Sequence, residues 1–266
     1  MKVIFSGVGE AFDENLPNTS LIVLAGDPAN QRQILLDCGF TAAHAFWRSS
    51  PEPAALDAVW ISHFHGDHFF GVPLLLLRFW EEKRTQPLTI IGQQGVKDKV
   101  TAAMELAYPG FYVKFAFTLD FVEVHAGQNL DLFGLKWSFA HSRHSKPCLG
   151  IRLDGESSSL YYSGDGQPSD ETTALATRCD LVVHEAFGIE PILPAHGSVD
   201  GCITFARQTG SRHLALVHMN HLIRKRHAAA VRTRLDALEN MHAFLPEPGE
   251  SITIGESGGR PGESMR

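Results

Sequence analysis

Short apolar runs bounded by glycine, proline, asparagine or aspartate predict β-strands through the first quarter of the chain. These runs are Val3–Ser6, Ser20–Leu24, Ile34–Leu36 and Ala58–Ile61. Two longer amphipathic segments then predict helices. Gly71–Glu82 has a proline in its first turn, and Val96–Tyr108 is followed by Pro109-Gly110.

The rest of the chain repeats the order of strands followed by helices. Strands are predicted at Leu88–Ile91, Lys114–Phe117, Phe121–Val124, Lys136–Ala140, Gly150–Leu153, Leu160–Ser163, Leu181–His184, His213–Val217 and Ser251–Ile254, and helices at Glu171–Thr177, Gly197–Thr209 and Ile223–Met241. Phe40–Pro53 is interpreted as a loop that packs on the core, with a pocket wall or a dimer contact as alternatives. Two such rounds predict an α/β fold with two sheets packed face to face and helices outside.

The segment His63-Phe64-His65-Gly66-Asp67-His68 places four metal-binding side chains in six residues, directly after a predicted strand. Alternate residues of an extended chain point the same way, so His63 and His65 can converge on one cation while Asp67 and His68 reach a second. Imidazole with carboxylate suits zinc, iron or manganese. A solvated cluster of loop histidines is the alternative, but the position at a strand end favours a metal site.

A site for two cations needs further ligands from other strand ends. The candidates are His144, Asp165 and His218. His141 competes with the first of these and His221 with the last, although His221 is expected on the following loop. Asp165 could bridge two ions about 3.5–4 Å apart with a nucleophilic hydroxide between them, or it could cap a turn.

These motifs together resemble the metallo-β-lactamase superfamily. HFHGDH, a lone histidine, Ser163-Gly164-Asp165 and a strand-terminal histidine follow one another as in that superfamily. Leu36-Asp37-Cys38-Gly39 and Ile91-Gly92-Gln93-Gln94-Gly95 are similar to segments of its ribonuclease Z-like and small-phosphodiesterase branch. The similarity covers nearly the whole chain and implies a four-layer αββα sandwich.

The resemblance implies two divalent metal ions, with zinc as the first expectation and iron or manganese as alternatives. One ion would be held by His63, His65 and His144, and the other by Asp67, His68 and His218, with Asp165 bridging them. Asp37 would orient a ligand histidine from behind, as carboxylates often do at metal-bound imidazoles.

A second pair of segments resembles the proton-transfer residues of ribonuclease Z-like enzymes. These segments are His184-Glu185-Ala186 and His196-Gly197-Ser198, the latter departing from the usual Ser-Thr after the histidine. An imidazolium held by a carboxylate can protonate the alkoxide released when a P–O bond breaks. Asp67, Glu185 and His196 are therefore the predicted catalytic residues. The alternative gives Glu185 a salt bridge to a helix and His196 a capping role.

The chain departs from the tRNA-processing enzymes of that branch. Asp165 follows His144 by only 21 residues, with a simple hairpin at Asp154-Gly155-Glu156-Ser157, where those enzymes carry a long tRNA-gripping arm. Met219-Asn220-His221 replaces the expected Ser-Arg-Tyr. A net charge of −7 also offers few contacts to the phosphates of long RNA.

The predicted function is therefore a dinuclear metal-dependent phosphodiesterase acting on a small or nucleotide-like phosphodiester, such as a cyclic nucleotide. Arg143 and Lys146 are either phosphate contacts or solvated surface charges. The alternatives are a tRNA 3′-processing endonuclease, a hydrolase of lactone, thioester or sulfate esters, and a non-catalytic protein that retains the metal ions.

Length and composition predict the domain organisation and the cellular compartment of the protein. The length of 266 residues, 44% of them hydrophobic, predicts a single domain over residues 1–256 with a mobile tail at 257–266. The four cysteines form no CxxC pair, the first residues do not resemble a signal peptide, and the apolar runs are too short for a bilayer. These features predict a cytoplasmic protein without a membrane partner, and the resemblance is compatible with a homodimer.

Overall fold

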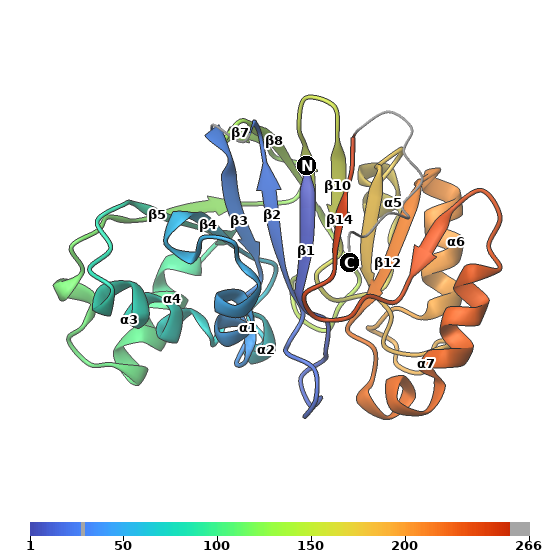
Figure 1. Ribbon diagram of the computed structural model, residues 1–266, viewed down its shortest axis with the longest axis horizontal. Coiled ribbons are helices and arrows are strands. Elements are labelled where there is room, and N and C mark those ends of the chain that lie inside the picture. The colour runs from blue at the N-terminus through green and yellow to red at the C-terminus, as the bar shows by residue number, and fades with distance from the viewer. Residues whose placement is uncertain (28–29, 256–266) are drawn as a thin grey trace.

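Two seven-stranded sheets make up the centre of the computed structural model, which describes residues 1–27 and 30–255 (Figure 1). The first sheet has the order β14 (Ser251–Thr253), β1 (Lys2–Gly7), β2 (Ser20–Ala25), β3 (Arg32–Leu36), β4 (Leu56–Ile61), β5 (Leu88–Gln93) and β6 (Leu119–Val124). The second has the order β13 (His242–Phe244), β12 (His213–Val217), β11 (Leu181–Glu185), β10 (Ser159–Tyr162), β9 (Leu149–Asp154), β8 (Leu135–His141) and β7 (Asn129–Leu132).

Helices cover the outer face of each sheet. Against the first sheet lie α1 (Ala42–Ser49), α2 (Gly66–Phe69), α3 (Val72–Glu81) and α4 (Val96–Ala107), and against the second lie α5 (Asp170–Leu175), α6 (Val199–Thr209) and α7 (His221–Asp236) (Figure 1). Two short 3-10 turns, Pro53–Ala55 and Tyr112–Lys114, precede β4 and β6. The predicted four-layer αββα sandwich is therefore confirmed. The predicted tail at 257–266 lies outside the described residues.

Three apolar layers hold the sandwich together, one between the sheets and one beneath each set of helices. Strands β3 to β6 pair in parallel, and the inner strands β3 and β4 are shielded on both faces, which explains their apolar runs Ile34–Leu36 and Ala58–Ile61. Between the sheets, the fully buried ring of Trp60 stacks on Phe139 with centroids 5.2 Å apart. This contact joins the strand that precedes the histidine motif to the opposite sheet.

The topology also determines where a functional site can lie. Strands β10 to β13 pair in parallel, as do β3 to β6. In such sheets the loops at the carboxyl ends of the strands form the usual ligand-binding edge. The candidate ligands in the loops after β4, β10 and β12 therefore meet at one end of the sandwich.

Four predictions of local structure are wrong. Lys114–Phe117 is not a strand: Tyr112–Lys114 forms a 3-10 turn, and the rings of Phe115 and Phe117 stack 4.9 Å apart against the core under α3 and α4. The helix predicted to reach Met241 ends at Asp236, and the chain then turns to form β13. The other two errors concern His221, which begins α7 instead of lying in a loop, and Phe40–Pro53, which contains α1.

The interpretation of Phe40–Pro53 as a core-packing segment is nevertheless confirmed for Phe46, which is completely buried. Strands β7 and β13, each at a sheet edge, had no counterpart in the sequence prediction. None of the helices within residues 1–27 and 30–255 combines the length and apolar character needed to cross a bilayer.

Replacing Trp60 by Ala tests the contact between the sheets. We expect the free energy of unfolding to fall by about 3–5 kcal/mol, because truncation removes a buried ring and leaves a cavity. Urea unfolding followed by circular dichroism measures the change. Leu106→Ala is the control, since Leu106 is 86% exposed on α4 and its truncation should cost about 0.5 kcal/mol or less. Equal losses in the two variants would contradict this account of the core.

Candidate metal centre

The loops that follow β4, β8, β10 and β12, together with α2, bring seven predicted ligands into two overlapping groups. The first group contains His63, His65, His144 and Asp165, and the second contains Asp67, His68, Asp165 and His218. Within each group the candidate ligand atoms all lie within 4.8 Å of one another. The structure thus brings together every residue that the sequence predicted as a metal ligand.

In the first group, three imidazoles and one carboxylate face a common point. Nε2 of His144 lies 3.2 Å from Nδ1 of His65. Nε2 of His63 lies 3.8 Å from Oδ2 of Asp165. The other nitrogen of His144, Nδ1, lies 3.0 Å from the Ala195 carbonyl oxygen, a contact that orients the ring.

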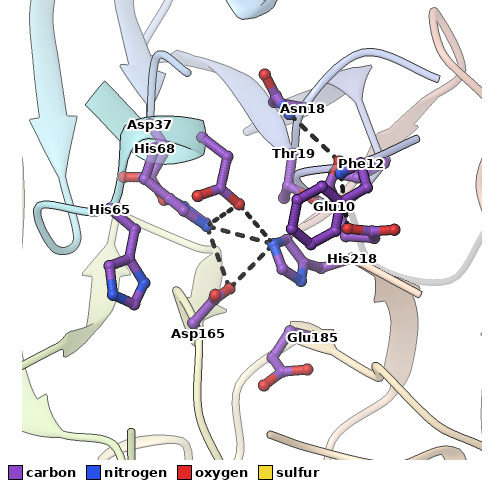
Figure 2. A network of polar contacts seen from close by, with 12 residues as sticks. Glu10, Phe12, Asn18, Thr19, Asp37, His65, His68, Asp165, Glu185 and His218 are labelled. Carbon is purple, nitrogen blue, oxygen red and sulfur yellow. Dashed lines mark hydrogen bonds and ion pairs between the residues drawn. The ribbon is translucent and has the colours of Figure 1, made fainter. Parts of the chain in front are cut away.

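The second group is tighter and more deeply buried. Nε2 of His218 lies 3.2 Å from Oδ2 of Asp67 and 3.5 Å from Oδ1 of Asp165. Nε2 of His68 lies 3.3 Å from the same Asp165 oxygen and 3.4 Å from Nε2 of His218. Figure 2 shows these contacts converging from three sides on the space between His68, Asp165 and His218.

Asp165 belongs to both groups because its two oxygens face different histidines. Oδ1 faces His68 and His218, whereas Oδ2 faces His63. The adjacent Gly164 has a φ of +58°, and a Cβ built there would lie 2.7 Å from Cβ of Ser62. Glycine is therefore required beside Asp165 so that this loop can approach the histidine motif closely. The arrangement is that of a carboxylate able to bridge two cations.

The protonation of the two groups fits divalent cations. Burial lowers the pKa of His63 well below its usual range, so its imidazole is neutral, and its buried Nε2 has no hydrogen-bond partner among the described residues. Burial raises the pKa of Asp165, but His218 and His68 outweigh it and keep the carboxylate ionised. Burial likewise lowers the pKa of His218, yet Asp165 raises it to about 9. The ionised carboxylates thus draw positive charge to this place, carried by a proton on His218 or, when metal is bound, by the cations.

Asp37 supports the second group from behind, as the resemblance implied. Its Oδ2 lies 2.8 Å from Nδ1 of His68 and accepts hydrogen bonds from the hydroxyls of Ser62 and Tyr162, each 2.7 Å long. Oδ1 accepts from the backbone N–H of Ser62 at 2.7 Å. Because Nδ1 of His68 is engaged in this way, Nε2 is left to face Asp165 and His218.

The predicted proton-transfer pair also lies at the site. Oε1 of Glu185 is 3.1 Å from Nδ1 of His196 and accepts from the backbone N–H groups of Gly166 and Gly197 at 2.8 and 2.9 Å. Burial lowers the pKa of His196, but the hydrogen bond that its ring donates to Glu185 outweighs this effect and raises the pKa. Glu185, His196 and His218 form a third group with ligand atoms within 4.8 Å of one another. An imidazole that tends to hold a proton therefore lies beside the second cation group.

The competing histidines lie elsewhere. His141 is exposed at the end of β8, whereas Nδ1 of His221 lies 2.6 Å from Oε1 of Glu10, which accepts its hydrogen bond. Arg143 and Lys146 are both exposed, and neither belongs to the metal-ligating groups.

Three residues that surround the site were missed in the sequence. Ser62 and Tyr162 contact Asp37, and Glu10 contacts His221. Ser62 and Tyr162 each directly precede a motif segment, and that position was a signal that could have found them. Glu10 had a weaker signal, an acidic residue just after the first strand and its glycines.

Comparison with solved structures identifies the fold. The metallo-β-lactamase fold protein YhfI from Bacillus subtilis superposes with a TM-score of 0.78 at 19% identity, covering 94% of this chain and 98% of that one. The short form of human tRNase Z gives a TM-score of 0.75 at 21% identity over 96% of this chain and 99% of that one. Such identities establish the shared fold alone.

Sequence comparisons define the family more narrowly. Ribonuclease BN from Escherichia coli is 34% identical over 156 residues, which are 58% of this chain and 50% of that protein, so the match spans about half the length of this curated relative. A family model described as the anti-Pycsar protein Apyc1 matches residues 1–236. The chain has the metallo-β-lactamase fold and belongs to the family of the anti-Pycsar protein Apyc1.

Proposed function

We propose that this protein is a metal-dependent phosphodiesterase that hydrolyses a small, nucleotide-like phosphodiester. The observation that carries the proposal is the position of the Glu185–His196 pair beside two ligand groups that share Asp165. A shared carboxylate suits two divalent ions, and a carboxylate-held imidazole suits protonation of an alkoxide leaving group.

The proposed ligands of one ion are His63, His65 and His144, and those of the other are Asp67, His68 and His218, with Asp165 shared. When bound, two divalent ions, zinc by first expectation, would lower the pKa of water and stabilise charge on the phosphoryl oxygens. Burial raises the pKa of Asp67, but hydrogen bonds with His218 and His68 outweigh it and keep the carboxylate ionised and oriented. Glu185 holds Nδ1 of His196, so that the opposite ring nitrogen can deliver a proton to the leaving oxygen.

The comparisons support chemistry at phosphorus. Ribonuclease BN, the tRNase Z and a diphosphatase of the PhnP family, which superposes with a TM-score of 0.73 at 16% identity, have names that denote cleavage of bonds to phosphate. The short hairpin between β9 and β10 supports a small substrate, because an arm that grips a large RNA is absent from this part of the described chain.

Metal content tests the ligand proposal without depending on activity. Asp165→Asn should reduce the metal content of the purified protein from about two equivalents to about one or fewer, because an amide nitrogen cannot bridge two cations. Inductively coupled plasma mass spectrometry measures the content. Asp120→Asn is the matched control on β6, where the side chain is exposed, and should leave the content unchanged. A folded Asp165→Asn protein that retains two equivalents would overturn the bridging role.

The substrate class is tested with the metal-loaded protein. We expect hydrolysis of a nucleoside cyclic phosphate and of bis(4-nitrophenyl) phosphate, and no turnover of either by Asp67→Ala, because that variant lacks a ligand and an orienting carboxylate. Liquid chromatography and absorbance measure the products. Trimming of precursor tRNA without hydrolysis of the small diesters would favour the tRNA-processing alternative, and hydrolysis of lactones or thioesters alone would remove the phosphodiesterase proposal.

The role of His196 is tested by changing the leaving group. His196→Ala should lower kcat for a cyclic nucleotide by about 10²–10⁴-fold, because an alkoxide needs a proton as it departs. Bis(4-nitrophenyl) phosphate should lose far less, since nitrophenolate is a stable anion and needs no donor. Steady-state kinetics on both substrates measures the difference. An equal loss on both would mean that His196 supports the site without donating the proton.

A further inference from the structure

The loop between β1 and β2 carries an aromatic side chain at the edge of the candidate metal centre. Phe12 is 76% exposed, so core packing does not explain it. Figure 1 shows this loop projecting from the end of the sandwich where α2 lies, and Figure 2 shows Phe12 beside Glu10 on the side of His218 away from Glu185.

The base of this loop is fastened to the second ligand group. The backbone N–H of His218 donates to the Val8 carbonyl oxygen at 2.9 Å, and Gly9 forms a β-bridge with Met219. His218 itself has a φ of +55°, an unusual conformation for a residue other than glycine. The loop therefore cannot move freely relative to the histidine that follows β12.

Glu10 fixes Phe12 relative to the start of α7. Its carboxylate, 1% exposed, accepts from the Phe12 backbone N–H through Oε2 at 2.8 Å. Oε1 contacts Nδ1 of His221 at 2.6 Å and accepts from the His221 backbone N–H at 3.2 Å. A buried carboxylate satisfied on both oxygens by these groups holds the segment in one arrangement.

The rest of the loop is held by its own side chains. Oδ1 of Asp13 accepts from the backbone N–H groups of Asn15 and Leu16 at 2.9 and 3.0 Å. Nδ2 of Asn18 donates to the Glu10 carbonyl oxygen at 3.3 Å, while Oδ1 of Asn18 accepts from the Thr41 backbone N–H at 3.0 Å. The loop thus presents Phe12 on an ordered support, at little further entropic cost on binding.

The ring of Phe12 differs from the other exposed aromatic rings near the site. Phe40 and Phe70 lie with centroids 5.7 Å apart and cover Gly66. Within residues 1–27 and 30–255, the Phe12 ring contacts no other aromatic ring. With 76% of the residue exposed, the ring is accessible to a planar group, and aromatic rings bind nucleobases by stacking with little dependence on base identity.

We propose that Phe12 is a specificity-determining residue that stacks on the nucleobase of the substrate, with Glu10 as its positioning residue. This inference rests on the proposed phosphodiesterase function and adds the recognised chemical group, a planar base attached to the phosphodiester. Stacking binds the base away from the reacting phosphate, so it acts on KM and leaves kcat nearly unchanged.

Kinetics with two substrates tests the proposal. One substrate is a nucleoside cyclic phosphate, and the other is glycerol 1,2-cyclic phosphate, which has no base. Phe12→Ala and Phe12→Leu should raise KM for the nucleotide about 5- to 20-fold, the lower part of the range for a base–aromatic stack, and Phe12→Trp should stay within about 2-fold. All three should leave KM and kcat for the glycerol compound within about 2-fold.

A matched pair on the same loop tests the positioning residue. Glu10→Gln should raise KM for the nucleotide selectively, because an amide cannot accept from both Phe12 and His221 as the carboxylate does. Glu14→Gln, at an exposed position of the loop, should change neither substrate.

Different results would overturn the phosphodiesterase function and the stacking role of Phe12. Wild-type protein that hydrolyses neither cyclic phosphate would overturn the proposed function. Wild-type hydrolysis of the nucleotide with Phe12→Ala changing both substrates equally, or neither, would overturn the stacking role alone. Full retention of nucleotide KM in Phe12→Leu would also overturn it, because apolar bulk without a π face would then be enough.

Discussion

The buried negative charge of Asp165 is the constraint on which the rest of the site depends. A carboxylate removed from water must be compensated, since an isolated charge in the interior costs several kcal/mol. Its two oxygens face histidines that come from both sheets, namely His63 and His68 after β4 and His218 after β12. Those imidazoles either hold protons or turn lone pairs toward cations. The histidines that surround the buried Asp165 carboxylate can therefore also serve as ligands for the cations that would balance its charge.

The sandwich maintains this geometry because its two halves are tied together near the site. Asp37, at the end of β3, contacts His68 on one sheet's loop and accepts a hydrogen bond from Tyr162 at the end of β10 in the other sheet. The stacked rings of Trp60 on β4 and Phe139 on β8 also join the sheets. Small displacements between the sheets would separate Asp165 from the histidine motif. The arrangement of the metal-ligating residues thus depends on the packing between the two sheets.

The parts of the site that sequence could predict are those encoded locally. HFHGDH lies within six residues after a strand, and Asp165 and His218 each end a recognisable strand, so their convergence follows from the topology. The contact of Glu10 with His221 joins residues 211 positions apart, and its local signal is a single acidic residue. The strand predicted at Lys114–Phe117 is wrong for the opposite reason, because there the local pattern was clear. Its aromatic pattern suits a strand, but tertiary packing places those rings on the core.

Two carboxylate–imidazole pairs lie on different sides of His218, and their surroundings suit them to different roles. In the first, Glu185 takes backbone N–H bonds from the loops after β10 and before α6, and His196 faces the ligand groups. In the second, Glu10 binds the backbone of Phe12, and His221 begins α7 outside those groups. Both carboxylates accept hydrogen bonds from backbone N–H groups, so the pairs differ in where the histidine lies. His196 lies within a ligand group and is placed for the proposed proton transfer, whereas His221 lies outside those groups and helps Glu10 to hold the loop.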